Sequence, residues 1–241
     1  MKNLKWMIPV VLVLTVSITS CKKHLFNSIK GKGATVTETR NLSGFDKISL
    51  SINADITYTQ DSVYFVEISA QQNVLDVITT EIEGGELKID SRKWIRKHNG
   101  IKIIIHSPDL RKIDLDGSGN FDSTGMLTTT GLELEISGSG NIRITGLTAG
   151  NLDADISGSG NISISGGAVT NEETEISGSG DIEMDNLTAN ISKAKISGSG
   201  SISVWAVDQL NAKISGSGDI KYRGNPAVNT TISGSGSVIH I

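Results

Sequence analysis

The stretch Ile136-Ser137-Gly138-Ser139-Gly140-Asn141-Ile142 decides the fold of this chain, because it recurs along the sequence at a nearly constant spacing. A degenerate copy occupies residues 115–121, and successive copies begin 21, then 20, 20 and 20, then 18 and 18 residues apart. A fixed period of this length indicates that one supersecondary unit is stacked on itself. The later copies begin at Ile156, Ile176, Ile196, Ile214 and Ile232.

Apolar residues alternate with polar ones on both sides of each copy. Counting by two, Leu134, Ile136, Ile142 and Ile144 share one face with the two glycines between them, and the polar residues share the other. Because the apolar column must be buried, the glycines are expected on the inner side. There they allow the opposing wall to approach closely, or the backbone to turn without a Cβ clash.

Coils of about 18–21 residues, each pairing with the next coil about 4.8 Å away, form a parallel β-helix. The handedness of parallel crossovers makes it right-handed. We therefore predict an all-β, single-stranded solenoid with its regular repeats at residues 111–241. A β-propeller blade needs about 40 residues, and a β-sandwich gives identical bends no reason to recur. Aromatic residues make up only 4% of the chain, which fits a narrow aliphatic core.

Residues 35–110 show the same alternation in shorter and less regular runs, with Gly84-Gly85 as a turn between two of them. Only residues 73–81 have a pattern that fits a helical turn. Since no linker separates this part from the repeats, we expect it to continue the solenoid in a more irregular form. The predicted head domain therefore covers residues 35–241.

Residues 1–20 have the pattern of a signal peptide, with Lys2 and Lys5 before an apolar stretch of eleven residues. Because spanning a bilayer takes about 20 apolar residues, this stretch is too short for a permanent anchor. It ends in Ile18-Thr19-Ser20-Cys21, which resembles the bacterial lipobox, and Cys21 is the only cysteine in the chain. We therefore predict cleavage before Cys21, acylation of Cys21, and a flexible lipidated tether at residues 21–34.

The residues after Cys21 favour one location for the protein. Lys22 and Lys23 follow the cysteine, so neither an inner-membrane retention aspartate nor an acidic surface-export run is present. We expect an outer-membrane lipoprotein in the cell envelope, on the periplasmic side rather than the cell surface. The net charge of −4 and the absence of a recognised basic cluster beyond the tether argue against nucleic-acid binding.

Two stretches resemble a known family. Residues 39–48 contain the entry Phe45-Asp46-Lys47-Ile48, and residues 104–110 end in Ser107-Pro108-Asp109-Leu110 before the first Gly-Ser-Gly bend. Together with the later bends they resemble the bacterial domain called putative auto-transporter adhesin, head GIN domain. The resemblance implies a right-handed β-helix in a lipoprotein or secreted protein. It implies no defined ligand and no catalytic residues.

Stacking of the coils is expected to bring carboxylates together on the outer side of one wall. Six of them come from three successive coils and lie beside lysines of the next coils, such as Lys193 and Lys195. One interpretation is a site for a divalent cation or a docking face for a cationic partner. The other is a solvated strand face whose charges need only avoid burial. The six residues are Glu133, Glu135, Asp153, Asp155, Glu173 and Glu175.

A second column of polar residues follows each Gly-Ser-Gly bend. Asn or Asp at a bend more simply forms local backbone hydrogen bonds or adopts a left-handed conformation than binds calcium, so we predict no metal site and no cofactor. The histidines lie outside the repeat columns, and seven copies of a serine do not make a catalytic centre, so no catalytic residue is predicted. The column consists of Asn120, Asn141, Asn161, Asp181, Ser201, Asp219 and Ser237.

Two functions remain open from the sequence. The first is a noncatalytic envelope lipoprotein, an adhesin-like binding or structural module for an unknown envelope polymer or protein. The alternative is a polysaccharide-active β-helix enzyme, a lyase or hydrolase, which would need unlike charged residues converging in one groove. Residues 237–241 are apolar and leave an unpaired strand edge at the last coil. From this edge we predict end-to-end self-association of the protein.

Overall fold

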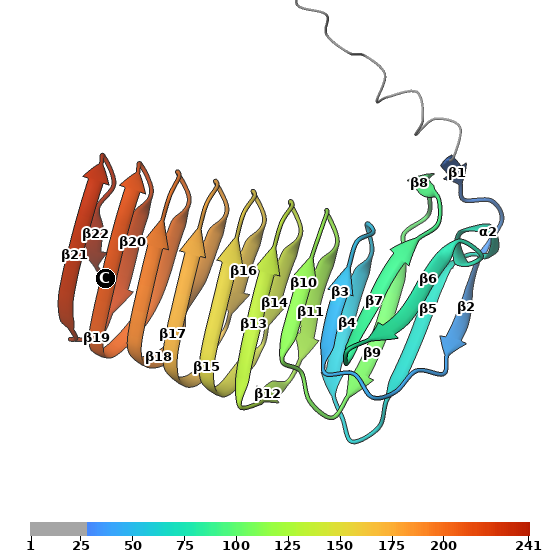
Figure 1. Cartoon of the computed structure of the whole chain (residues 1–241), viewed down its shortest axis with the longest axis horizontal. Helices are drawn as coiled ribbons and strands as arrows, with labels where there is room; N and C mark the ends of the chain where they lie inside the picture. Colours follow the sequence, from blue (N-terminus) through green and yellow to red (C-terminus); the bar gives the residue numbers. More distant parts are fainter. Residues whose placement is uncertain (1–27) are drawn as a thin grey trace, which may run out of the picture.

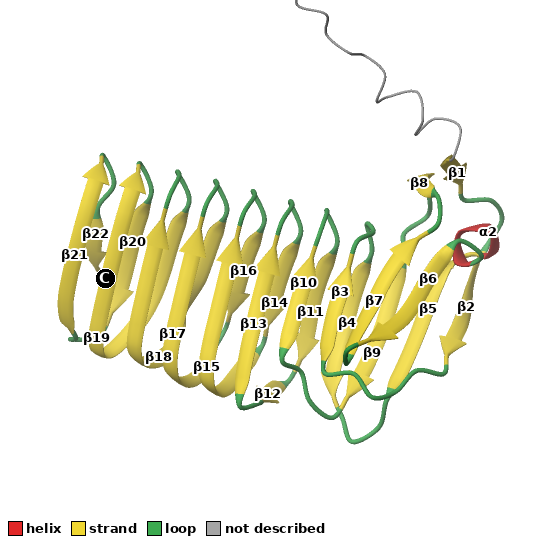
Figure 2. Cartoon of the chain, viewed as in Figure 1, coloured by secondary structure: helices red, strands yellow, loops and turns green. Residues whose placement is uncertain are grey.

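The computed structural model describes residues 28–241. It is a β-solenoid of stacked parallel coils, as the repeat predicted. The coils follow one another along the long axis of the molecule, with loops at the bends (Figures 1 and 2). The one helix in the described part of the chain is a single turn, α2 (Gln72–Leu75), which overlaps the start of the segment 73–81 where the sequence indicated a helical turn.

Each regular coil has three faces, and every face is a ladder of parallel strands. The first face carries the incoming strand of each repeat, the second face the outgoing strand, and the third closes the coil. The long strands bend around a corner and contribute to more than one face. The first face contains β7 (Glu86–Ser91), β3 (Lys47–Leu50), β10 (Lys112–Leu115), β13 (Gly131–Ile136), the ends of β15 (Gly146–Ile156), β17 (Gly167–Ile176), β18 (Asp181–Ile196) and β19 (Ser201–Gly216), and β21 (Ala227–Gly234).

The second face runs along the opposite side of the core, and the third face is short. The third face consists of β12 (Met126–Thr128), the starts of β15 and β17 and the middle parts of β18 and β19. The second face contains β9 (Lys102–Ser107), β4 (Asp55–Gln60), β11 (Asn120–Thr124), β14 (Asn141–Ile144), β16 (Asn161–Ile164), the first parts of β18 and β19, β20 (Asp219–Arg223) and β22 (Val238–His240).

Aliphatic ladders fill the core. The isoleucines that begin the repeats form one ladder, in which Ile136, Ile156, Ile176, Ile196 and Ile214 pair in register and are fully buried. Ile232 continues the ladder by pairing with Ile214, but it is 46% exposed. Ile232 is exposed because no coil of the described chain covers β21.

The glycines of the bends face the neighbouring coil rather than the opposing wall. A Cβ on Gly138 would lie 2.0 Å from the carbonyl oxygen of Gly117, and one on Gly158 would lie 2.1 Å from that of Gly138. The same carbonyls accept hydrogen bonds from the next coil, as Gly138 O does from the N–H of Ser159 at 2.9 Å. From the sequence we expected these glycines to face the inner side, whereas the structure shows that the short distance between stacked coils requires them.

The part before the repeats is only partly a continuation of the solenoid. The coil made of β7 and β9 stacks in parallel on the coil made of β3 and β4, although it comes later in the sequence. Three other strands pair antiparallel, so the expectation of continuous coils is wrong for them. The hairpin turn at Gly84-Gly85, with φ of 60° and 79°, reverses the chain between two strands. The antiparallel strands are β2 (Thr35–Arg40), β5 (Phe65–Gln71) and β6 (Ile78–Glu83).

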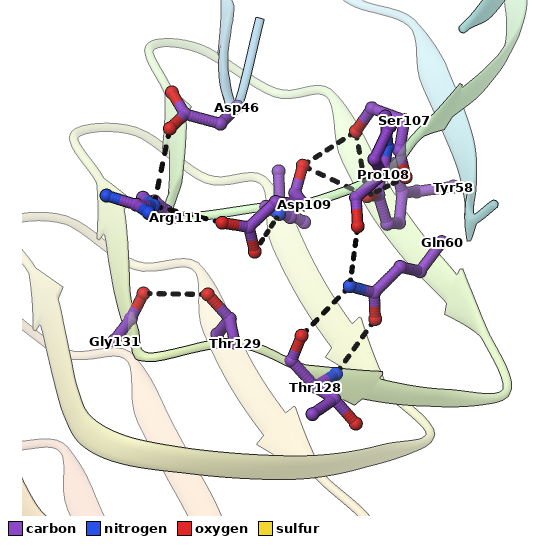
Figure 3. A network of polar contacts seen from close by, with 11 residues as sticks. Asp46, Tyr58, Gln60, Ser107, Pro108, Asp109, Arg111, Thr128, Thr129 and Gly131 are labelled. Atoms are coloured by element: carbon purple, nitrogen blue, oxygen red, sulfur yellow. Dashed lines mark hydrogen bonds and ion pairs between the residues drawn. The ribbon is translucent and has the colours of Figure 1, made fainter. Parts of the chain in front are cut away.

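A polar network joins this irregular part to the first regular coil (Figure 3). The buried Tyr58 hydroxyl contacts the Ser107 hydroxyl at 2.9 Å, and Ser107 Oγ donates to the carbonyl of Asp109 at 2.8 Å. Arg111 Nε lies 3.0 Å from Asp109 Oδ2. Partial burial opposes ionisation of Asp109, but hydrogen bonds from Arg111, Thr129 and the Leu110 N–H hold its pKa below the ordinary value. The Ser-Pro-Asp-Leu motif thus serves the fold at this corner.

The first described residues are packed on the head. Strand β1 (Ser28–Lys30) pairs in parallel with β8 (Trp94–Lys97), and the two form a separate small sheet beside the N-terminal end of the solenoid (Figure 1). Asn73 Nδ2 donates to the carbonyl of Lys30 at 2.8 Å. Strand β1 lies within residues 21–34, the segment predicted as a tether, and it packs on the head.

Candidate functional site

The six predicted carboxylates lie together on the outer side of the first face. The register pairs Glu133 with Asp153 and Asp153 with Glu173. A second row pairs Glu135, Asp155 and Glu175 in the same way. The residues that alternate with them, such as Leu134 and Ala154, are buried, so the carboxylates point away from the core. We call this set of six residues the acidic wall.

Lysines at both edges neutralise the outer coils of the acidic wall. Lys112 Nζ lies 2.9 Å from Glu133 and 2.8 Å from Glu135, so it bridges both carboxylates of the first coil. Partial burial opposes the charge of Lys112, but the hydrogen bonds that it donates to Glu135 and Glu133 raise its pKa above the ordinary value. The third coil is neutralised from the other side, where Lys193 lies 3.2 Å from Glu173 and Lys195 pairs with Glu175.

The middle coil of the acidic wall has no such compensation. Among residues 28–241, no lysine, arginine or histidine forms an ion pair with Asp153 or Asp155. Partial burial, with the neighbouring Asp153 and Glu175, raises the pKa of Asp155 to about 6. The pKa of Asp153 is also raised, by burial first and then by Glu173 and Glu133. These two aspartates therefore form a centre where a bound positive charge would relieve repulsion.

The geometry favours cationic groups of a partner over a chelated ion. Within the part of the chain that the structure describes, no group of three or more His, Cys, Asp or Glu residues is arranged to hold a metal ion. Instead, neighbouring carboxylates repeat every coil, about 4.8 Å apart. A shallow groove runs along the start of these strands and is lined by Asn151, Asp153, Asn171 and Glu173 among others. An extended partner can therefore contact several coils at once.

The polar column after the bends forms hydrogen bonds between coils. Asn141 Nδ2 donates to Asn120 Oδ1 at 2.9 Å, and Asn161 Nδ2 donates to Asn141 Oδ1 at 2.9 Å. Asp181 Oδ1 accepts the backbone N–H of Ser201 at 2.8 Å. No non-glycine residue of the described chain has a positive φ. The predicted local or left-handed role is therefore wrong, because these side chains join one coil to the next.

The histidines that the structure describes do not come together in one site. His106 lies 3.5 Å from Asp61, and His240 packs on Tyr222 at the other end of the solenoid. Cys21 and the predicted signal peptide lie outside the described residues. From Ser28 onward, no helix has the length and apolar character needed to cross a membrane.

Sequence reasoning missed two features. A basic cluster exists beyond the tether, because β1 brings Lys30 and Lys32 beside the run Arg92-Lys93-Trp94-Ile95-Arg96-Lys97. That run can be recognised in the sequence, and it could have indicated the basic cluster. Glu172 was also missed: it occupies a core position and is only 2% exposed. The alternation of strand β17 already placed Glu172 on the inner face, as an exception in an apolar column.

Comparisons with known proteins agree with the fold and indicate a family. The profile of the family described as "putative auto-transporter adhesin, head GIN domain" matches residues 44–226. A crystal structure of a putative adhesin from Bacteroides fragilis is similar over 88% of this chain and 100% of its own, with 29% identity and a TM-score of 0.84. A comparison with the curated proteins finds no match.

Two structures from Parabacteroides are also similar. One, from Parabacteroides distasonis, is named a putative lipid binding protein. It has 29% identity and a TM-score of 0.76, over 89% of this chain and 99% of its own. The other is a putative adhesin from Parabacteroides merdae, with 23% identity and a TM-score of 0.72 over the same shares, and it supports the fold alone.

Proposed function

Because the chain belongs to the family described as putative auto-transporter adhesin, head GIN domain, we propose that it is a noncatalytic lipoprotein of the cell envelope. In this proposal the solenoid is an adhesin-like module that binds an extended envelope polymer or protein. The acidic wall makes the contact, and the partner carries amino or other cationic groups. The observation that carries the proposal is the uncompensated pair Asp153 and Asp155 at the centre of the wall.

The lipid anchor is proposed from the sequence around Cys21. The apolar stretch, the Ile18-Thr19-Ser20-Cys21 junction and the absence of any other cysteine all support acylation at this residue. The lysines that follow support the periplasmic side of the outer membrane. Mass spectrometry of the mature N-terminus tests this part of the proposal, and an unmodified start at another residue would contradict it.

A binding role fits the repeating architecture better than catalysis does. A catalytic site brings a few unlike residues together in one pocket, whereas the acidic wall repeats similar residues over three coils. Repetition of weak contacts along a polymer produces strong overall binding, because each additional contact forms at high effective concentration. The adhesin names of the family and of a structural relative support the same role.

The wall is tested by removing its central charges. The full-length protein, purified in detergent, is applied to an array that includes amine-bearing polysaccharides such as chitosan together with neutral and anionic polymers. We expect binding to the amine-bearing polymers. We expect the double variant Asp153→Asn/Asp155→Asn to bind at least about ten-fold more weakly, because charge-assisted contacts contribute about 1.5–3 kcal/mol each.

The matched control is Glu183→Gln/Asp208→Asn, which removes the same charge at exposed positions outside the wall. This control should bind like the unaltered protein. Equal loss in both variants would show that net charge alone matters, and would contradict a role for the wall. Turnover of an envelope polysaccharide, abolished by one substitution, would favour the enzyme alternative.

A further inference from the structure

The small sheet at the N-terminal end is a rigid projection. We call residues 28–34 and 91–100 the basic arm. Ile29 pairs with Ile95, and both pack against the core. The Gly31 N–H donates to the carbonyl of Lys97 at 2.7 Å. Asn73 fixes the arm to the solenoid, because its side chain accepts the Lys32 N–H at 2.8 Å and donates to the Lys30 carbonyl. The backbone of the arm is therefore held at a fixed position on the solenoid.

The charge of the basic arm has a single sign. It contains six lysines and arginines and no aspartate or glutamate, whereas the other described residues contain 12 lysines and arginines against 26 aspartates and glutamates. All six side chains are exposed, and none belongs to an ion pair among residues 28–241. The head is thus a strongly acidic body with a basic end. The six residues are Lys30, Lys32, Arg92, Lys93, Arg96 and Lys97.

An exposed tryptophan lies among these cations. Trp94 is 61% exposed, more than any other large hydrophobic side chain in the described chain. It stands opposite Ser28 in the β1–β8 pair, next to the inward-facing Ile95. Tryptophan is enriched at membrane–water interfaces, because one part of its ring system is apolar and its N–H donates a hydrogen bond. Clustered lysine and arginine side chains bind anionic lipid headgroups.

We infer that the basic arm docks on an anionic lipid bilayer and orients the solenoid away from it. This inference rests on the proposed lipid anchor. The seven residues from Cys21 to Ser28 span at most about 25 Å when extended, so an acylated Cys21 keeps the arm close to the bilayer. The acidic body is repelled by the same anionic surface, so both signs of charge favour one orientation, with the far coils directed away from the bilayer.

The inference is tested on the full-length protein held in vesicles by its own anchor. Trp205→Phe leaves Trp94 as the single tryptophan of the mature chain after Trp6 is removed with the signal peptide. Acrylamide quenching of Trp94 is then compared between vesicles of phosphatidylcholine and vesicles containing phosphatidylglycerol as well. We expect Trp94 to be protected in the anionic vesicles only, and the protection to decline as salt is raised.

A charge variant and its matched control separate docking from anchoring. Lys93→Gln/Arg96→Gln/Lys97→Gln should abolish the protection, since each cation removed lowers the equilibrium constant for docking about five-fold. Lys102→Gln/Lys213→Gln/Lys221→Gln, which changes the net charge equally outside the arm, should retain it. If the protein does not remain on the vesicles at all, the anchor is wrong rather than the arm.

Two results would overturn the inference. One is quenching of Trp94 that is the same in both kinds of vesicle while the protein stays anchored. The other is protection of Trp94 by a soluble polyanion such as dextran sulfate without protection by anionic vesicles. That second result would assign the arm to a soluble polyanionic partner instead of a membrane.

Discussion

At the scale of single residues, the distance between coils determines which residue type can occupy the second position after each ladder isoleucine. In coil after coil this position carries a glycine whose Cβ would collide with a backbone carbonyl, as for Gly178, where the Gly158 oxygen would lie 2.0 Å away. The obstructing atom belongs to the backbone of a paired coil, so it cannot rotate away. The φ of Gly178 lies outside the left-handed region. At Gly178 the requirement for glycine is therefore steric rather than conformational.

Gly178→Ala is expected to destabilise the protein by about 1–3 kcal/mol, the usual effect of forcing an extra carbon into a packed site. The control is Gly166→Ala, because the nearest atom to its Cβ is 3.8 Å away and its φ is also outside the left-handed region. We expect this control to change the free energy of unfolding by less than about 0.5 kcal/mol. Urea denaturation measures both, and equal effects would contradict the steric explanation.

At the scale of one ladder, Glu172 interrupts an apolar column. The register places it between Leu152 and Ser192, and Leu132 and Leu210 lie further along the same column. Ser192 Oγ lies 3.1 Å from Glu172 Oε1, while Oε2 has no hydrogen-bond partner in the structure. Burial raises the pKa of Glu172 to about 8, against a weaker lowering by Ser192. The carboxyl is therefore protonated in the folded protein at neutral pH.

The raised pKa of Glu172 makes stability depend on pH. The folded protein retains this proton up to about pH 8, whereas an unfolded glutamate loses it near its ordinary value. Between these values the folded state binds more protons, so stability falls as pH rises, by up to about 1.4 kcal/mol per pH unit. We expect Glu172→Gln to lose this slope between pH 6 and pH 8 in urea denaturation. Glu183→Gln, at an exposed position, should keep it. A Glu172→Gln variant with an unchanged slope would contradict the assignment.

At the scale of the whole molecule, the two ends of the solenoid differ. The N-terminal end is covered by β2, β5, β6 and α2, and its arm is basic. At the other end β21 pairs only with β19, and β22 only with β20. Residues 225–241 contain no charged Asp, Glu, Lys or Arg. Open strand edges are usually protected by charges or short strands, so this end favours pairing with another strand.

We predict that the 241-residue protein self-associates through this end, with β21 of one copy beside β21 of a second copy. Ile232→Lys should restore the monomer, because the side chain of Ile232 stacks on Ile214 and faces the space that an added coil would bury. Thr231→Lys adds the same charge to the outer side of the strand and should have a smaller effect. Light scattering after size-exclusion chromatography measures the mass. A monomer at every concentration of the unaltered protein would contradict the prediction.

Residue spacing alone predicts the solenoid, the isoleucine ladder and the composition of the acidic wall. In a chain with a fixed period, residues about 20 positions apart become neighbours, so position in the repeat predicts position in space. Glu133, Asp153 and Glu173 could be placed in one row for this reason, and the structure confirms that row. The glycines of the bends followed from the same alternation.

The features that break the period depend on tertiary packing. The coil of β7 and β9 stacks outside an earlier coil, and Lys30 meets Lys97 across a long stretch of sequence. No repeat relates these positions, so nothing in the spacing predicts their contact. Which carboxylates are neutralised also depends on side-chain distances, since Lys112 and Lys195 reach the outer coils but leave Asp155 without an ion pair. Periodicity specifies which coils are adjacent, but the unique contacts that bear on function come from packing between segments that do not repeat.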